Sequence, residues 1–198
     1  VKDVFIKRAK IISSLREYLD ANGFIEVETP VLQPVYGGAY ARPFITYHNS
    51  LDQSLFLRIA DELYLKRLII GGFEKVYEIA KNFRNEGMDR NHNPEYTSLE
   101  YYEAYADVYS MMDFTEKLFK YVADKTGELS FKYAENKIDL HQPFKRQPMF
   151  SLLQEYVGID MSTMNTKDLL DVAKSKSLEV NETMNYGQVL NKIFDELI

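Results

Sequence analysis

Two runs of aromatic and β-branched residues, joined by a polar loop, constrain the fold of this chain more than any other feature. Residues 75–83 and 96–106 alternate in the manner of strands, and the loop between them contains Gly87, Asn93 and Pro94. Runs of this kind are typical of antiparallel neighbours in a sheet. Because successive side chains of a strand point to opposite faces, the second strand has one predicted face made by Tyr96, Ser98, Glu100, Tyr102 and Ala104.

Helices and shorter strands surround this pair in the sequence. Residues 3–22 have apolar side chains at helical spacing, with Asp3 suited to the N-cap and Gly23 to the position after the C-cap. Asp61 is likewise suited to cap a helix that runs to residue 70. Further helices are predicted at 111–125, 149–157, 166–176 and 186–197, and further strands at 24–29, 44–47, 55–59 and 129–138. The chain is therefore expected to belong to the α+β class.

Residues 148–198 differ from the part before them. They are acidic, they are predicted to be helical, and they contain no concentrated functional motif. The predicted organisation is a sheet-containing core over residues 1–147 and a helical segment over residues 148–198. No internal repeat is apparent in either part.

Composition excludes several classes of protein. No stretch approaches the roughly 18 apolar residues of a membrane span, and no signal peptide is recognisable, so a cytoplasmic protein without membrane contact is expected. The chain has no cysteine, and His48 and His141 lack partners at metal-ligand spacing, so no metal site is predicted. A net charge of −6 is not the footprint of a nucleic-acid-binding surface.

Chemistry-bearing side chains gather around the polar loop. Arg84 and Glu86 stand two residues apart where the first strand ends, and arginine offers paired donors to a phosphate or a carboxylate. Alone, this pair would be interpreted as a solvated ion pair. However, His92 follows on the loop, and Glu100 and Tyr102 share one face of the returning strand. The convergence of these groups predicts a site for an anionic, polar ligand.

Two segments resemble the signatures of the class II aminoacyl-tRNA synthetases. The segment from Phe83-Arg84-Asn85-Glu86 to Glu100 is similar to their second signature, an aromatic-Arg-x-Glu strand with a loop and a returning strand. The segment Gly23-Phe24-Ile25-Glu26-Val27-Glu28-Thr29-Pro30 is similar to their first. Within the class, Gly37-Gly38-Ala39-Tyr40-Ala41-Arg42-Pro43-Phe44 and Arg58-Ile59-Ala60-Asp61-Glu62-Leu63-Tyr64-Leu65-Lys66-Arg67 most resemble the lysine–tRNA ligases.

The resemblance implies a fold and an assembly. The fold is an antiparallel sheet flanked by helices, incomplete in this chain, with residues 148–198 as a C-terminal helical insertion. The assembly is a homodimer formed through the helix and strand of residues 3–30. The implied activity is ATP-dependent activation of lysine to lysyl-adenylate, followed by transfer to tRNA(Lys).

The resemblance also implies roles for particular residues, with Arg84 as the catalytic one because it would hold both the ATP α-phosphate and the lysine carboxylate. The implied ATP-binding residues are Arg84, Glu86, His92, Asn93 and Tyr96. The implied lysine-binding residues are Gly38, Glu62, Arg84, Glu100 and Tyr102. Mg²⁺ is implied together with ATP, with its ligands expected outside this chain.

The chain departs from the family pattern in several respects. Asp61 stands where the family commonly has proline. The third signature of the class, the acidic segment that precedes it and the N-terminal anticodon-binding barrel do not occur in these residues. The chain is therefore expected to be part of a longer enzyme and to have little or no activity alone.

Alternative interpretations remain open at this point. The chain could be a binding or regulatory module derived from a truncated synthetase, or a paralogue that lysylates a protein, although Gly37-Gly38-Ala39 disfavours the paralogue. Glu62 could be an ordinary carboxylate at a helix N-terminus, and Glu100 and Tyr102 could belong to a solvated sheet face. Tyr101 and Tyr105 are interpreted as core or interface residues.

Overall fold

A computed structural model describes all 198 residues of the chain, which divides into two compact units, Val1–Pro143 and Phe144–Ile198. The division predicted at residue 148 lies slightly later, at the start of the first helix of the second unit. None of the helices combines the length and the apolar character that a membrane span requires.

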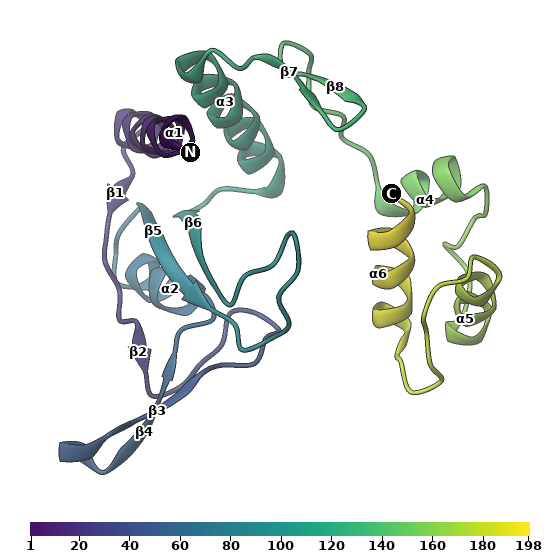
Figure 1. Cartoon of the computed structure of the whole chain (residues 1–198), viewed down its shortest axis with the longest axis horizontal. Coiled ribbons are helices and arrows are strands. Elements are labelled where there is room, and N and C mark those ends of the chain that lie inside the picture. The colour runs from purple at the N-terminus through teal and green to yellow at the C-terminus, as the bar shows by residue number, and fades with distance from the viewer. The chain divides into compact units, whose positions relative to one another are not determined.

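The first unit is built from three α-helices and eight short strands (Figure 1). Its helices are α1 (Lys2–Ala21), α2 (Glu62–Ile70) and α3 (Val108–Thr126). Its strands are β1 (Ile25–Glu26), β2 (Leu32–Gln33), β3 (Ile45–His48), β4 (Gln53–Leu57), β5 (Lys75–Phe83), β6 (Glu95–Glu103), β7 (Ser130–Tyr133) and β8 (Asn136–Asp139), with a 3-10 turn, η1 (Asn49–Leu51), between β3 and β4.

The central sheet has the strand order β1-β5-β6. β5 and β6 are antiparallel along their whole lengths, from Lys75 opposite Glu103 to Phe83 opposite Glu95, which confirms the predicted strand pair. β1 joins β5 in parallel, so the prediction of an antiparallel sheet was wrong for this strand. The chain between them passes through β2, β3, β4 and α2 and returns in the same direction, as a parallel pair requires.

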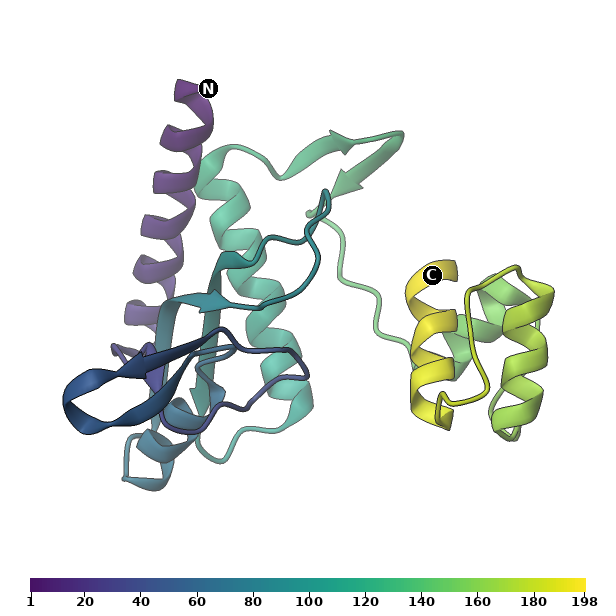
Figure 2. The ribbon, with the colours of Figure 1, turned by 60° about the horizontal axis from the view of Figure 1, so that its bottom comes forward.

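The two faces of this sheet have different neighbours. One face contributes Tyr77, Leu99 and Tyr101 to a core with Leu19 of α1 and Phe114 of α3. The two helices contact each other across this face (Figure 2). The other face packs against α2. The sheet therefore has one apolar face under α1 and α3, and a second face on which polar side chains are free to form a site.

The predicted boundaries were wrong at several places. α1 begins with Val1 at its N-cap, and Asp3 lies in its first turn without capping it. Gly23 follows the helix with φ of 80°, as predicted. α3 begins three residues before the predicted start because Asp107 and Ser110 form a capping box. Tyr105, just before it, is fully exposed, so of its two predicted places, core or interface, the core is excluded.

Two smaller sheets complete the first unit. β2, β4 and β3 form one antiparallel sheet in that order, and β7 and β8 form a two-stranded hairpin. The strand over 24–29 is shorter than predicted, because only Ile25 and Glu26 pair with β5. The hairpin of β3 and β4 closes through η1, where Nδ1 of His48 accepts a hydrogen bond from the Leu51 main chain at 3.3 Å.

The second unit consists of three helices, α4 (Met149–Val157), α5 (Thr166–Ser175) and α6 (Tyr186–Leu197), close to their predicted positions. Their apolar sides form a core. Both α5 and α6 begin at an asparagine in a capping box, Asn165 with Asp168 and Asn185 with Gln188. Each asparagine follows the same Thr-Met pair, twenty positions apart in the chain. The two caps therefore share a short sequence pattern.

Candidate functional site

The polar loop between β5 and β6 is tied at its base by main-chain hydrogen bonds. The Arg84 N–H donates to the Pro94 carbonyl at 2.8 Å, which closes the loop just beyond the strand pair. The Asn85 N–H donates to the Arg42 carbonyl at 2.8 Å. The glycine-bearing loop before β3 and the polar loop after β5 are therefore fixed side by side, although they lie far apart in the sequence.

A cavity of about 350 Å³ opens over this loop and the site face of the sheet. Its lining consists of Arg84, Glu86, Gly87, Asn91, His92, Asn93, Tyr96 and Ser98. All five residues predicted to bind ATP are in this set. Cζ of Arg84 lies 5.3 Å from the centroid of the Tyr96 ring, and Nε of Arg84 is buried without a hydrogen-bond partner. The arginine thus keeps a donor available to a bound anion.

His92 is held on the rim of this cavity by Asp89, a residue that the sequence analysis did not single out. Nδ1 of His92 lies 2.8 Å from Oδ2 and 2.9 Å from Oδ1 of Asp89. Oδ1 also accepts the main-chain N–H groups of Asn91 and His92, and these bonds, with the imidazole, lower the pKa of the Asp89 carboxyl. An aspartate that bonds to the main chain two residues on is a usual turn signal and could have been found.

Glu86 faces the glycine-bearing loop. Its Oε1 accepts a hydrogen bond from the Arg42 N–H at 3.3 Å, and its own N–H donates to the Arg84 carbonyl at 2.9 Å. The carboxylate is therefore anchored at one oxygen beside the cavity. Its second oxygen leaves an acceptor that a base amine can use.

Glu100 and Tyr102 lie next to each other on β6, as the predicted shared face requires. The Tyr102 hydroxyl donates to Oε2 of Glu100 at 2.8 Å. Burial raises the pKa of Tyr102, and its hydrogen bond to Glu100 and the nearby charges of Glu62 and Asp61 add to the effect. The phenol therefore stays neutral in a group of three carboxyl side chains.

Glu62 begins α2 close to both Gly38 and Tyr102. Gly38 has φ of 87°, and a β-carbon there would lie 2.9 Å from Cβ of Glu62, so only glycine fits. Nζ of Lys66 lies 2.6 Å from Oε1 of Glu62 and 5.9 Å from the centroid of the Tyr102 ring. Apart from Arg84, which lines the cavity, the residues predicted to bind lysine thus surround the N-terminus of α2.

Asp61 occupies the predicted N-cap position of α2, but its side chain does not cap the helix. Its side chain makes no capping hydrogen bond and is fully buried, with Oδ1 accepting from Nδ2 of Asn82 at 3.0 Å. Asn82 shares the strand face of Arg84, two residues on, and was not predicted from the sequence as a site residue. Glu100 is the other neighbour of Asp61. Burial, followed by the hydrogen bond to Asp61 and its negative charge, raises the pKa of Glu100 to about 7.

A buried ion pair supports the site from within. Nη1 of Arg58 lies 2.6 Å from Oε1 of Glu78, and both side chains are only 4% exposed. Nε of Arg58 donates to the Lys81 carbonyl at 2.8 Å. The Arg58 carbonyl in turn accepts from the Phe83 N–H at 2.9 Å, directly before Arg84. The guanidinium thus fixes the end of β4 against β5 at the position from which Arg84 projects.

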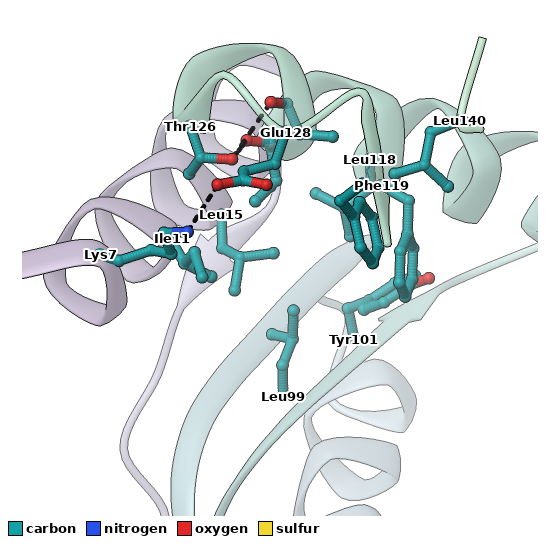
Figure 3. A pocket seen from close by; sticks show the side chains of 13 residues that line it. Lys7, Ile11, Leu15, Leu99, Tyr101, Leu118, Phe119, Thr126, Glu128 and Leu140 are labelled. Atoms are coloured by element: carbon teal, nitrogen blue, oxygen red, sulfur yellow. Dashed lines mark hydrogen bonds and ion pairs between the residues drawn. The ribbon is translucent and has the colours of Figure 1, made fainter. Parts of the chain in front are cut away.

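A larger hollow lies on the opposite face of the sheet and has a different character (Figure 3). It measures about 640 Å³ and is lined mainly by apolar side chains of α1, α3 and β6, among them Ile11, Leu99 and Leu118. Lys7 and Glu128 pair across its edge at 2.6 Å (Figure 3). It contains no group of converging donors or charged side chains, so it is not the candidate site.

The chain contains no group of three or more histidine, aspartate or glutamate side chains arranged to hold a metal ion. No residue of this chain is therefore assigned to Mg²⁺.

The comparisons with known proteins identify the family of this chain. A family model described as tRNA synthetases class II (D, K and N) matches residues 1–181. A lysine–tRNA ligase of Thermoanaerobacter pseudethanolicus is 54% identical, covering 100% of this chain and 40% of the relative. Those of Carboxydothermus hydrogenoformans and Porphyromonas gingivalis are 52% and 51% identical, covering 100% and 99% of this chain.

The chain spans 41% and 34% of the length of the last two relatives. The match nevertheless extends over nearly the whole of this chain, and includes both the loop of Arg84 and the start of α2. The chain belongs to the class II tRNA synthetases of the D, K and N group.

Proposed function

We propose that this chain forms one wall of the active site of an enzyme that activates lysine with ATP and transfers the lysyl group to tRNA(Lys). The relatives that match the chain along its whole length are named lysine–tRNA ligases. The observation that carries the proposal is the position of Arg84. Arg84 lines the 350 Å³ cavity, and its Nε has no hydrogen-bond partner. Asn82 lies two residues before Arg84 on the same strand face and donates a hydrogen bond to Asp61 at the start of α2.

On the nucleotide side, Arg84 binds the α-phosphate because its guanidinium offers two parallel donors to phosphate oxygens. Tyr96 stacks on the adenine ring, and burial raises the pKa of its hydroxyl, so the ring stays neutral. Glu86 and the main chain at Asn93 bind the edge of the base. His92, held by Asp89, faces the terminal phosphates.

On the amino-acid side, Glu62 and the main chain of Gly38 bind the α-ammonium, and Glu100 and Tyr102 bind the side-chain ammonium. A carboxylate oxygen of lysine attacks the α-phosphorus, the new P–O bond forms, and pyrophosphate leaves. Arg84 touches both reactants and stabilises the charge that develops at the α-phosphate. Holding the two reactants in line supplies much of the remaining rate enhancement.

The proposal extends to the surroundings of this site. Residues 148–198 form a helical insertion, ATP is used together with Mg²⁺ held elsewhere, and tRNA charging takes place in the cytoplasm. Residues 1–198 alone are expected to have little or no activity. Neutralisation of phosphates by Lys and Arg supplies most of the affinity for nucleic acid. Because this chain is acidic, most contacts with the tRNA backbone are expected to come from residues outside it.

A homodimer through residues 3–30 is part of the same proposal. Large apolar side chains stand exposed along this segment, including Val4 at 69%, Phe5 at 67% and Ile25 at 51% exposed. A partner copy would cover them, as apolar patches of this kind usually require. Phe5→Glu is expected to produce monomers in analytical ultracentrifugation, and an unchanged dimer would place the interface elsewhere.

The activity is tested by lysine-dependent exchange of pyrophosphate into ATP with the protein at its natural length. Arg84→Ala is expected to lower the exchange rate by roughly two to three orders of magnitude, the usual cost of removing a donor to a developing charge. Arg67→Ala removes an arginine of α2 whose Cζ lies 4.8 Å from the centroid of the Tyr64 ring, and it serves as the control. Near-normal exchange by Arg84→Ala, or exchange that requires another amino acid, contradicts the proposal.

A further inference from the structure

Asp61 and Glu100 form a carboxyl pair at the start of α2. Asp61 has no exposed surface, and its Oδ2 is buried without a hydrogen-bond partner; the Glu100 carboxyl lies close enough for the negative charge of Asp61 to contribute to its raised pKa. Two neighbouring carboxylates in a buried setting cannot both remain charged, so one of them keeps a proton. The pair therefore shares a single proton when no ligand is bound.

Glu100 is the member that carries this proton. Nδ2 of Asn82 donates to Oδ1 of Asp61, so this oxygen acts as an acceptor. Oδ2 of Asp61 is buried and has no hydrogen-bond partner, so it is open to a donor. A protonated carboxyl supplies that donor. The raised pKa of Glu100, about 7, agrees with this assignment.

We propose that Asp61 is a positioning residue of the lysine site, which couples the binding of a cationic side chain to the release of the proton that Asp61 shares with Glu100. This inference rests on the proposed function, in which Glu100 binds the side-chain ammonium of lysine. The O–H bond of Glu100 breaks, the proton passes to solvent, and an N–H of the ammonium takes its place as donor. The site carries the same net charge before and after binding.

The other charged groups around the pair do not substitute for Asp61. Glu62 and Lys66 belong to α2, and Glu78 belongs to β5. Arg84 follows β5 directly, and the titratable Tyr96 and Tyr102 belong to β6. Glu62 is paired with Lys66 at 2.6 Å, and Glu78, which stands opposite Glu100, is paired with Arg58 at 2.6 Å. Only Asp61 presents an unpaired, buried carboxylate oxygen.

The pair also favours a cationic side chain over a neutral one. A neutral side chain cannot replace the shared proton, because it brings no charge to balance two carboxylates. A cation is attracted by both Asp61 and Glu100, and this attraction is strong because a buried site has a low effective dielectric constant. Asp61 therefore adds discrimination that proline, the residue implied by the family resemblance as common at this position, could not supply.

The coupling predicts how the affinity for lysine depends on pH. Protons compete with lysine for Glu100 while the pH is below the raised pKa, so affinity for lysine is expected to fall roughly tenfold for each pH unit below about 7. Above that value the affinity is constant. In Asp61→Asn, the amide donates to the Glu100 carboxylate instead of sharing a proton, and affinity is expected to become nearly independent of pH between about 5.5 and 8.

The test combines two measurements on the protein at its natural length. The first is a ¹³C NMR titration of the Glu100 carboxyl without ligand, which should give a midpoint near 7 in the native protein and an ordinary glutamate midpoint in Asp61→Asn. The second is calorimetry of L-lysine without ATP, near pH 6, in buffers of different ionisation enthalpy. About one proton should be released per lysine bound, and much less in Asp61→Asn.

Glu103→Gln is the matched control, because it removes a carboxylate from the same strand that is paired with Lys75 at 2.9 Å on the other face. It should leave both the proton count and the Glu100 midpoint unchanged. If lysine binds without proton release, or if Glu100 titrates as an ordinary glutamate, the inference is overturned and the proposed function stands. If lysine does not bind at all, the proposed function fails and takes the inference with it.

Discussion

Gly38 and Glu62 approach each other so closely that no side chain fits between them. A β-carbon on Gly38 would lie 2.9 Å from Cβ of Glu62 and 3.2 Å from Cβ of Ala60. The glycine also has φ of 87°, a conformation that costs other residues strain. The contact brings the glycine-bearing loop against the start of α2, and it sets the place of the Glu62 carboxylate.

Gly38→Ala is therefore expected to weaken lysine binding, because the added methyl must displace either the loop or Glu62. Loss of one well-placed charged partner corresponds to roughly ten- to a hundredfold in Kd. Calorimetric titration with lysine measures the effect. Gly72→Ala is the control, since Gly72 also has a positive φ of 103° but open space around it. Equal losses in both variants would assign the effect to backbone strain and not to the contact with Glu62.

The buried pair of Arg58 and Glu78 is predicted to hold the framework of the site. Arg58→Met leaves a carboxylate in a place where it is 4% exposed, and such a change destabilises proteins by about 3–5 kcal/mol. Urea denaturation measures this loss. Arg16→Met removes the partner of Glu26 at the surface, where both side chains are more than a third exposed, and should cost about 0–1 kcal/mol. Similar costs for the two variants would contradict the prediction.

Much of the fold could be predicted from periodicity, because the long elements repeat their pattern often enough to be recognised. β5 and α1 were predicted to within one residue of their ends, and β6 was predicted to within one residue of its start but three residues too long at its end. β2 was not predicted, since two residues carry no period, and its partner Leu57 lies far along the chain. The direction of β1 was also outside the reach of a local pattern, because it depends on how the chain returns after α2.

The site residues also differ in whether a local sequence pattern could predict them. Arg84, Glu100 and Tyr102 could be predicted because strand alternation and family resemblance both indicate them. Asp61 was predicted to be a helix cap from its residue type alone. The structure turns its side chain inward to Asn82 instead, an interaction between residues twenty-one positions apart that no local rule contains.

The repeated caps of the helical unit lead to a prediction about its stability. Oδ1 of Asn165 accepts from the N–H groups of Lys167 and Asp168, and Oδ1 of Asn185 accepts from that of Gln188. Replacing either asparagine by alanine should cost about 1 kcal/mol. Asn191→Ala, within α6, is the control and should cost less than about 0.5 kcal/mol. Thermal denaturation compares the three, and equal effects would mean that the caps contribute nothing specific.

The last prediction concerns the hold of Asp89 on His92. Asp89→Ala removes the acceptor for two main-chain N–H groups and for the imidazole, so the ring loses its orientation toward the cavity. The expected result is a several-fold rise in KM for ATP with little change in KM for lysine. Pyrophosphate exchange at varied concentrations of each substrate separates the two constants.

Asp139 offers a matched control for this change, because Oδ1 of Asp139 lies 2.8 Å from Nδ1 of His141 and also accepts its N–H, away from the cavity. Asp139→Ala should leave both constants unchanged. The pKa of Asp89 is lowered by its bonds, so the ordering of the loop should be complete above the ordinary aspartate pKa of about 4 and lost as pH falls below it. A KM for ATP in the native protein that follows Asp89 ionisation near neutral pH would contradict this account.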